Sequence, residues 1–327
     1  MKIVFDLDSN VPFYKLPSDI FAALVETLPE HRMLRVKHNQ LAKEIVDADV
    51  VVSYWVQPRV FQTAKSLKAI FYAIDGVGAE HLYKEVVESE VIITNSSGCR
   101  SQAIAEHAIS LVLACSRRLV ELSNSMDSKG WWGNSLAQDG RPPGEISGKT
   151  IGVLGLGHVG RRIAAIAKNG FGMKVLGLKR VIEGVENVEK VYPLTELNEL
   201  LSKSDIVVCA LPKTPSTENT ISSRAFSAIK HGSIFVNISR GDLVDEEALI
   251  SSIKAGRVAA AGLDVFTQEP LPSDSQLFSL PQVVTTPHAA GMTPEFWPRF
   301  ARLVRDNIKA IEKGELPTNI VSKTHGY

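Results

Sequence analysis

Three side chains that can handle protons and carboxylates follow apolar runs in the second half of the sequence. Arg240 comes directly after SIFVNIS, Glu269 follows shortly after GLDVF, and His288 ends VVTTPH. If these runs are parallel strands, the residues lie at the carboxyl edge of one sheet, where open α/β sheets bind ligands. An arginine can hold a substrate carboxylate, and a histidine can protonate a developing alkoxide. A carboxylate beside the imidazole would orient it and favour its charged form, so the set suits reduction of a 2-oxoacid.

A glycine pattern typical of phosphate binding lies upstream of these residues. Gly155, Gly157 and Gly160 form G-x-G-x-x-G between the apolar run 150–154 and the helical run 161–168. The first glycine permits the tight turn, the second lets backbone approach a pyrophosphate, and the third lets the helix pack on the strand. The helix N-terminus adds unpaired N–H groups and a positive dipole. The pattern predicts a dinucleotide site. Beside it, the three residues above gain a chemical interpretation, although each alone could be an ordinary loop residue.

Two cations stand where the next strand of this unit should end. An NAD-selective site normally places Asp or Glu about 20 residues after the glycines, to accept a hydrogen bond from the ribose 2′-OH. Here the corresponding positions hold Leu178, Lys179 and Arg180. An ammonium and a guanidinium can pair with a 2′-phosphate, which a carboxylate would repel. We therefore expect NADP(H) as cofactor. NAD is the weaker alternative, and it would apply if both cations are only solvated strand-end charges.

Short β-branched runs alternate with helical patterns along the chain, which is typical of parallel sheets with crossover helices. One series of runs covers 2–7, 49–55, 69–74 and 91–96, and a second covers 150–157, 174–179, 205–212, 233–239, 262–266 and 283–288. Between the two series, strong helix formers predict one long helix over 101–121. Residues 127–149, rich in Gly, Pro and polar residues, predict an irregular arm whose Trp131 and Trp132 pack on a neighbouring domain or subunit.

Composition narrows the class of protein. A chain of 327 residues with 44% hydrophobic residues is long enough for two domains. The formal net charge of +0 gives no overall attraction to nucleic acid or to anionic lipid, so we expect neither as partner. Cys99, Cys115 and Cys209 are too far apart for a CxxC pair or a metal cluster, so we expect no metal. Their odd number, and an N-terminus without a continuous apolar core, favour a reducing, cytoplasmic compartment.

The order of several motifs extends these interpretations. GLGHVG, ALPKTPST, NISRGDLVDEEAL, GLDVFTQEP and TPHAAG follow one another, preceded by AIDGVGAEHL and NSSGCRSQAIAEHAISLVL. This series resembles the D-isomer-specific 2-hydroxyacid dehydrogenase family over essentially the whole chain. The resemblance implies two doubly wound α/β domains with a cleft between them. A flavodoxin-like substrate domain would be built from 1–104 and 290–327, and a Rossmann-type dinucleotide domain from 105–289.

The resemblance also implies roles for individual residues. Arg240 matches the substrate-binding arginine, Glu269 the acid that supports the histidine, and His288 the catalytic acid/base. Val77 and Gly78 match a loop whose backbone N–H groups receive the substrate carboxylate, and Trp55 is expected to border the substrate. The implied cofactor contacts, in addition to the glycines and cations above, are His158, Val159, Leu211, Pro212, Thr217, Ile238, Ser239, Asp264, His288 and Gly291. From the residues alone, Asp264 could equally be a strand-end carboxylate satisfied by backbone donors.

The nearest match in pattern is to the NADP-using glyoxylate and hydroxypyruvate reductases, because basic residues replace the ribose-binding acid. The expected partners are therefore a small 2-oxoacid or D-2-hydroxyacid and, by family likeness, a second copy of the chain in a homodimer. Two alternatives remain open: a dinucleotide-sensing scaffold like the corepressors that resemble this family, and NAD-linked oxidation of a D-2-hydroxyacid. His107 is expected to be structural rather than a second acid, and Cys209 to be core.

Overall fold

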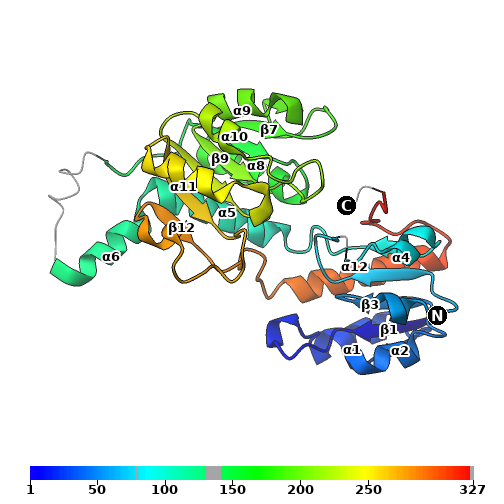
Figure 1. The fold of residues 1–327 in the computed structure, drawn as a ribbon. Coiled ribbons are helices and arrows are strands. Elements are labelled where there is room, and N and C mark those ends of the chain that lie inside the picture. Colours follow the sequence, from blue (N-terminus) through cyan, green and yellow to red (C-terminus); the bar gives the residue numbers. More distant parts are fainter. Residues whose placement is uncertain (79, 130–140, 325–327) are drawn as a thin grey trace. The chain divides into compact units, whose positions relative to one another are not determined.

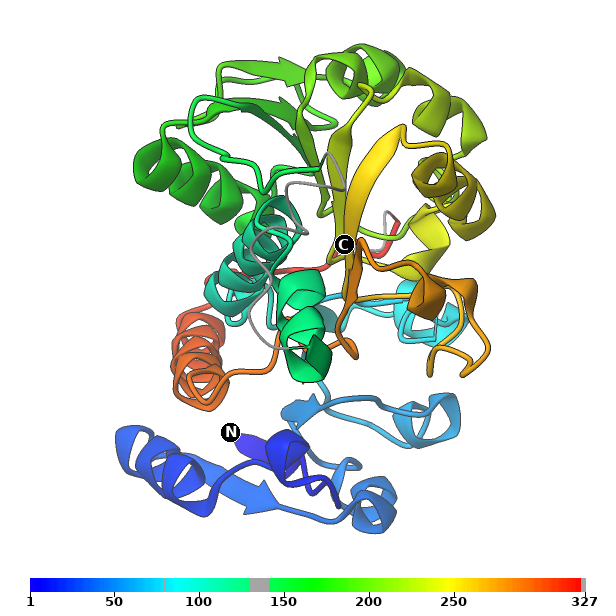
Figure 2. The ribbon, with the colours of Figure 1, turned by 90° about the vertical axis from the view of Figure 1, so that its left-hand side faces the viewer.

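The computed structural model describes residues 1–78, 80–129 and 141–324. The chain divides into two compact units, shown as ribbons in Figures 1 and 2. Met1–Arg100 and Met292–Tyr327 together form the unit that we call the terminal unit, and Ser101–Gly291 form the central unit. The terminal unit is therefore built from both ends of the chain, and the central unit from one continuous segment.

The terminal unit holds a five-stranded parallel sheet in the order β2-β1-β3-β4-β5. Its strands are β1 (Lys2–Asp6), β2 (Arg32–Arg35), β3 (Val50–Ser53), β4 (Ala69–Tyr72) and β5 (Ile92–Thr94). Its helices are η1 (Pro12–Tyr14), α1 (Ser18–Thr27), η2 (His38–Gln40), α2 (Leu41–Glu44), α3 (Pro58–Phe61), α4 (Lys84–Glu88) and α12 (Phe296–Glu312). Leu24 of α1 and Phe300 of α12 belong to one buried cluster, and Leu41, Phe61 and Val86 to a second. Helices thus cover both faces, which explains why β3 and β4 are apolar at every position but one.

The central unit holds a seven-stranded parallel sheet in the order β12-β11-β10-β9-β6-β7-β8. Its strands are β6 (Thr150–Leu154), β7 (Lys174–Leu178), β8 (Lys190–Tyr192), β9 (Ile206–Cys209), β10 (Ser233–Asn237), β11 (Val258–Leu263) and β12 (Val283–Thr285). Its helices are α5 (Ser101–Ser116), α6 (Leu119–Lys129), α8 (His158–Phe171), η3 (Leu194–Glu196), α9 (Leu197–Lys203), α10 (Ser223–Ala228), η4 (Gly241–Leu243), α11 (Glu246–Lys254) and η5 (Gln276–Ser279). Helices α5 and α8 supply one buried cluster, and α9, α10 and α11 the other, so helices flank this sheet too (Figure 2).

Both strand orders confirm the predicted fold class. The central unit has the doubly wound order of dinucleotide-binding sheets, and the terminal unit has the flavodoxin-like order. Two strands, β2 and β8, were not predicted; they are short outer strands whose residues are mostly exposed or half-buried. The predicted run 262–266 begins too late, because β11 already begins at Val258 with the small residues VAAA.

The prediction of a single helix over 101–121 is wrong. The chain breaks after α5, where Arg118 takes a left-handed backbone with φ 53°, and restarts as α6, which runs to Lys129. Helix thus occupies the start of the segment expected to be an irregular arm. Trp131 and Trp132 lie outside the described residues. Among the residues that the structure describes, no helix combines the length and apolarity required to cross a membrane.

All three cysteines are buried and free. Burial raises the pKa of Cys99 to about 11 and that of Cys115 to about 12, so both thiols are protonated at neutral pH. Cys209 lies on β9 with no exposed surface, which confirms that it is a core residue.

Each of the two sheets has an aspartate–lysine ion pair at its amino end. Asp49, just before β3, accepts from the backbone N–H of Lys2 at 2.8 Å and pairs with Lys68 at 2.9 Å. Asp205, just before β9, accepts from the backbone N–H of Thr150 at 2.9 Å and pairs with Lys230. Burial works against ionisation of each carboxylate, but the lysine and the amide outweigh it and lower both pKa values. Each aspartate thus fixes the start of a central strand.

Candidate active site

The glycine turn has the local packing that its spacing predicts. Gly155 follows β6 with φ 100°, and a Cβ there would lie 2.6 Å from the carbonyl oxygen of Ala210. A Cβ on Gly160 would lie 1.8 Å from the carbonyl oxygen of Gly155, so helix α8 can approach the strand only because this residue has no side chain. Gly157, by contrast, precedes α8 with open space around its Cβ position. Tight first and third glycines beside an open second one leave the exposed backbone free to approach a pyrophosphate.

The two predicted cations lie at the end of β7, and a carboxylate stands beside them. Lys179 donates a hydrogen bond from Nζ to Glu183, and Arg161 of α8 reaches the same carboxylate oxygen at 3.6 Å. This hydrogen bond from Lys179, more than any other influence, holds the pKa of Glu183 below its ordinary value. Arg180 is exposed. Neither Arg161 nor Glu183 was predicted as a site residue, because nothing in the sequence shows that the loop 180–189 turns back toward the start of α8.

Arg240 lies where the sequence predicts, directly after β10. Its side chain is exposed and donates from Nη1 to the carbonyl oxygen of Ser239 at 2.7 Å. Asn237, the last residue of the strand, donates from its amide to the backbone oxygen of Arg240 at 3.1 Å. A Cβ on Gly241 would lie 1.9 Å from the carbonyl carbon of Phe266. The loop that carries Arg240 therefore packs backbone to backbone against the loop that leads to Glu269.

His288 and Glu269 form a direct pair. The distance from Nδ1 of the imidazole to Oε2 of the carboxylate is 2.7 Å, and the other carboxylate oxygen accepts from the backbone N–H of Phe266 at 3.1 Å. Both side chains are partly exposed, at 46% for His288 and 37% for Glu269. Because Glu269 occupies Nδ1, the ring presents Nε2 as the nitrogen that can meet a substrate.

Asp264 fixes the backbone of the loop that ends in His288. Its carboxylate, in a residue only 1% exposed, accepts from the backbone N–H groups of Ala289 at 2.9 Å and Ala290 at 3.0 Å. It also accepts from the Thr286 hydroxyl at 2.6 Å, and its backbone oxygen accepts from the N–H of His288 at 2.8 Å. The structure thus contains the arrangement considered as the alternative in the sequence analysis, a strand-end carboxylate satisfied largely by backbone donors.

His107 completes this group from helix α5. Its Nε2 lies 2.9 Å from the Thr286 hydroxyl and 3.5 Å from Asp264. A histidine bound to the residues behind the loop, rather than to the exposed edge, suits the structural role expected of it.

The remaining expected cofactor residues of the central unit lie on the loops after β6, β9, β10 and β12. His158 is exposed and Val159 half-buried at the start of α8, and Pro212 is exposed on the turn after β9. Thr217 closes that turn through a hydrogen bond from its hydroxyl to the Pro212 carbonyl oxygen at 2.6 Å. The others, Leu211, Ile238, Ser239 and Gly291, are buried or half-buried. All four loops belong to the carboxyl edge of the sheet.

The expected substrate residues of the terminal unit also share one sheet edge. Trp55 follows β3, and Val77 and Gly78 lie on the loop after β4. The indole N–H of Trp55 donates to the backbone oxygen of Glu80 at 3.1 Å, which joins the two loops. The Glu80 carboxylate lies 2.3 Å from the Cβ position of Gly78, so it covers the backbone expected to receive a substrate carboxylate. Glu80 was not among the predicted site residues.

The family follows from comparison with known proteins. Residues 109–290 match the family model described as "D-isomer specific 2-hydroxyacid dehydrogenase, NAD binding domain". This match covers more than half of the chain.

The chain belongs to the D-isomer specific 2-hydroxyacid dehydrogenase family.

Relatives within this family agree over nearly the whole length. The chain is 36% identical to a glyoxylate reductase of Thermococcus gammatolerans over 91% of this chain and 90% of that protein. It is 33% identical to a glyoxylate reductase of Korarchaeum cryptofilum over 86% of this chain and 85% of that protein. Among solved structures, a D-isomer specific 2-hydroxyacid dehydrogenase from Xanthobacter autotrophicus Py2 in complex with NADPH and MES has a TM-score of 0.84 and 27% identity. It covers 100% of this chain and 99% of that chain.

Membership makes this dehydrogenase an oxidoreductase with a nicotinamide-dinucleotide domain in its central unit.

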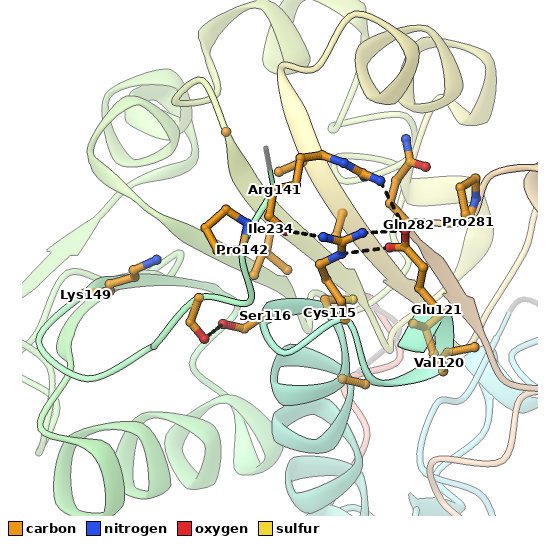
Figure 3. A pocket seen from close by; sticks show the side chains of 17 residues that line it. Cys115, Ser116, Val120, Glu121, Arg141, Pro142, Lys149, Ile234, Pro281 and Gln282 are labelled. Carbon is orange, nitrogen blue, oxygen red and sulfur yellow. Dashed lines mark hydrogen bonds and ion pairs between the residues drawn. The ribbon is translucent and has the colours of Figure 1, made fainter. Parts of the chain in front are cut away.

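A cavity of about 220 Å³ in the central unit lies away from the residues described above (Figure 3). Gly232, Ala259 and Gln282 line it at the amino ends of β10, β11 and β12, whereas Arg240, Glu269 and His288 follow the carboxyl ends. The ion pairs from Arg118 and Arg141 to Glu121 border this cavity. It is therefore not the predicted site.

Proposed function

We propose that the chain is an NADP(H)-dependent reductase that converts a small 2-oxoacid, such as glyoxylate or hydroxypyruvate, into the corresponding 2-hydroxyacid. The observation that carries this proposal is the 2.7 Å pair of His288 with Glu269. The loops that carry this pair and the loop that carries Arg240 all follow the carboxyl ends of strands in the sheet whose first strand leads into the glycine turn. Acid, cation and phosphate-binding backbone are the parts that such a reduction requires.

The dinucleotide would be held by backbone and by two cations. Gly155, Gly157 and Gly160 fit a pyrophosphate, because the open position at the second glycine lies at the N-terminus of α8. We assign the 2′-phosphate to Lys179 and Arg180, at the end of β7. The turn closed by Thr217 and the loops after β10 and β12 would line the nicotinamide side. When bound in its reduced form, the nicotinamide supplies the hydride for the carbonyl carbon.

The residues of the chain would then manage charge and the proton. Arg240 holds the substrate carboxylate and polarises the adjacent carbonyl, which makes its carbon a better hydride acceptor. As negative charge develops on the carbonyl oxygen, His288 donates a proton from Nε2, and the product is the neutral alcohol. Glu269 holds the ring by Nδ1 and stabilises the imidazolium that precedes this transfer. Asp264 acts through the backbone of residues 288–290 and is a positioning residue.

The terminal unit would supply the other contacts to the substrate. We assign the substrate carboxylate to the backbone of Val77 and Gly78, with Trp55 bordering the substrate. The exposed carboxylate of Glu80 beside Gly78 would have to move for an anion to bind there, since like charges repel. In this assignment the terminal unit is the substrate domain, and the central unit is the dinucleotide domain.

An absorbance assay tests the proposal. NADPH is mixed with glyoxylate, hydroxypyruvate, pyruvate or a longer 2-oxoacid, and its oxidation is followed at several enzyme concentrations. We expect oxidation with glyoxylate or hydroxypyruvate. Where the product is chiral, we expect a single enantiomer. Failure to oxidise NADPH or NADH with any of them would favour the scaffold alternative instead. Light scattering of the same sample tests the homodimer that the family resemblance implies.

A further inference from the structure

Glu183 lies between the cations that flank the expected adenosine ribose. Lys179 ends β7, and Arg161 is on the first turn of α8, directly after the glycine motif. Both reach the same carboxylate oxygen, Lys179 through a hydrogen bond and Arg161 at 3.6 Å. The carboxylate is 51% exposed, whereas Lys179 is only 22% exposed. The Glu183 carboxylate is thus an anion of the chain itself that already pairs with the more buried Lys179.

In dinucleotide sites of this topology, the ribose 2′ position lies beside the end of the second strand. That strand is β7, and its end is occupied by Lys179. A 2′-phosphate held by Lys179 would need the ammonium group that Glu183 now occupies. A ribose 2′-OH makes no such demand, because it is neutral and can donate a hydrogen bond to a carboxylate.

We propose that Glu183 competes with the 2′-phosphate of NADP(H) for Lys179 and Arg161 and thereby keeps the site open to NAD(H). This inference rests on the proposed function, because it concerns the same dinucleotide site. It assigns cofactor preference to three residues rather than to the lysine and arginine at the strand end alone. The carboxylate lowers the preference that the two cations would otherwise give.

The magnitude follows from the exposure of the groups. An exposed ion pair is weakened by the surrounding solvent, so it changes binding by no more than about fivefold. Removing the negative charge should therefore change the preference severalfold rather than abolish binding of either cofactor. Reversing the charge should have a larger effect, since it adds a cation where it removes an anion.

Calorimetric titration with NADP⁺ and NAD⁺ in the absence of substrate tests the proposal on the full chain. For Glu183→Gln we expect the ratio of the NAD⁺ to the NADP⁺ dissociation constant to rise about fourfold, mainly through tighter NADP⁺ binding. For Glu183→Lys we expect a rise of about tenfold. Both effects should shrink when the salt concentration is raised from 50 mM to about 500 mM, because exposed charges are screened.

Glu189→Gln is the matched control. Glu189 is a similarly exposed acid of the same segment, and it pairs with Lys168 at 3.5 Å. Its substitution should leave the ratio within 1.5-fold of the wild-type value. A ratio that stays within 1.5-fold in both Glu183 variants would overturn the proposal while the proposed function stands. Absence of binding of either dinucleotide to the wild-type chain would overturn both.

Discussion

His288 has an unusual backbone for a residue with a side chain. Its φ of 51° lies in the left-handed region, which is unfavourable for residues other than glycine. Three hydrogen bonds to Asp264 hold it there: the aspartate backbone oxygen accepts from the His288 N–H, and the carboxylate accepts from the two following N–H groups. Strained backbone that is held in place by several surrounding contacts is common at functional sites. Here it aims the imidazole at Glu269.

Replacement of His288 by Gln should remove the proton donor and leave the dinucleotide site intact. We expect kcat for 2-oxoacid reduction to fall by about 10²–10⁴, the usual contribution of a general acid. The NADP⁺ dissociation constant should stay within about twofold, because the phosphates are assigned to other elements. Stopped-flow absorbance and calorimetry measure the two quantities. Turnover close to that of the wild type would remove His288 from the chemistry.

Replacement of Arg240 by Gln should mainly impair handling of the substrate. The side chain is exposed and its hydrogen bond goes to the neighbouring Ser239 carbonyl oxygen, so the fold should lose little. We expect kcat/KM for the 2-oxoacid to fall by about 100-fold or more, since a charge-assisted contact contributes about 1.5–3 kcal/mol and carbonyl polarisation is lost as well. Steady-state kinetics over a range of oxoacid concentrations measures this effect. An unchanged kcat/KM would contradict the assigned role.

At this scale, the sequence indicated which polar residues follow strands but not which residues form ion pairs with one another. Arg240, Glu269 and His288 could be singled out because each follows an apolar strand, and strand ends are visible in the sequence. Glu183 and Glu80 could not, because their positions depend on how a loop folds back on Arg161 or on Gly78. Loop conformation is set by turn geometry that leaves little trace in residue type.

Close backbone approach links the loops of the central unit. The loop after β10 can touch the loop after β11 only because position 241 is glycine, where a Cβ would overlap Phe266. The Asn237 amide fixes the same loop from the other side through the Arg240 carbonyl oxygen. The relative positions of Arg240 and Glu269 thus depend on a glycine and an asparagine with no role in the reaction.

Gly241→Ala should therefore lower stability and activity together. The new Cβ would lie 1.9 Å from the backbone carbonyl carbon of Phe266, which cannot move aside as a flexible side chain can. We expect a loss of about 1–3 kcal/mol in the free energy of unfolding, measured by urea denaturation, together with a fall in kcat/KM. Gly170→Ala is the control: it lies in α8 with open space around its Cβ position and should stabilise the protein by about 0.5–1 kcal/mol. Equal stability of the two variants would contradict the packing argument.

Elements differ in how clearly the sequence marks them. The interior strands have apolar runs because helices cover both faces, whereas β2 and β8 are short outer strands that contain Arg or Lys. The break between α5 and α6 could not be predicted, because arginine does not signal a left-handed backbone. Glycine or asparagine would have done so. In the structure Arg118 is held there by its ion pair with Glu121.

On the scale of the whole molecule, both units start their central strands with the same aspartate and lysine pair. Asp49 and Asp205 each have a lowered pKa, so each stabilises the folded chain while it is ionised. This contribution is complete above the ordinary aspartate pKa of about 4 and is lost as the pH falls through the lower folded value. The protein should thus lose stability in acid from both units at once.

Asp205→Asn and Asp49→Asn test this directly. At pH 7 each variant should unfold at a lower urea concentration than the wild type, by about 1 kcal/mol in free energy, since an amide oxygen accepts more weakly than a carboxylate and cannot pair with lysine. Below about pH 3 the difference should shrink, because the wild-type carboxylates also become protonated. Tryptophan fluorescence can follow unfolding. A difference that is the same at both pH values would assign the effect to lost packing rather than to charge.

The origin of the terminal unit in two chain segments has a consequence for synthesis. Phe296, Phe300 and Val304 of α12 pack in the same cluster as Phe5 and Leu24, near the beginning of the chain. A ribosome releases β1 to β5 long before it makes α12, and the whole central unit emerges in between. The central unit can then fold as soon as it is complete, whereas the first sheet must wait with one apolar face covered only in part, by α1. The sheet that is made first is thus the one that is completed last.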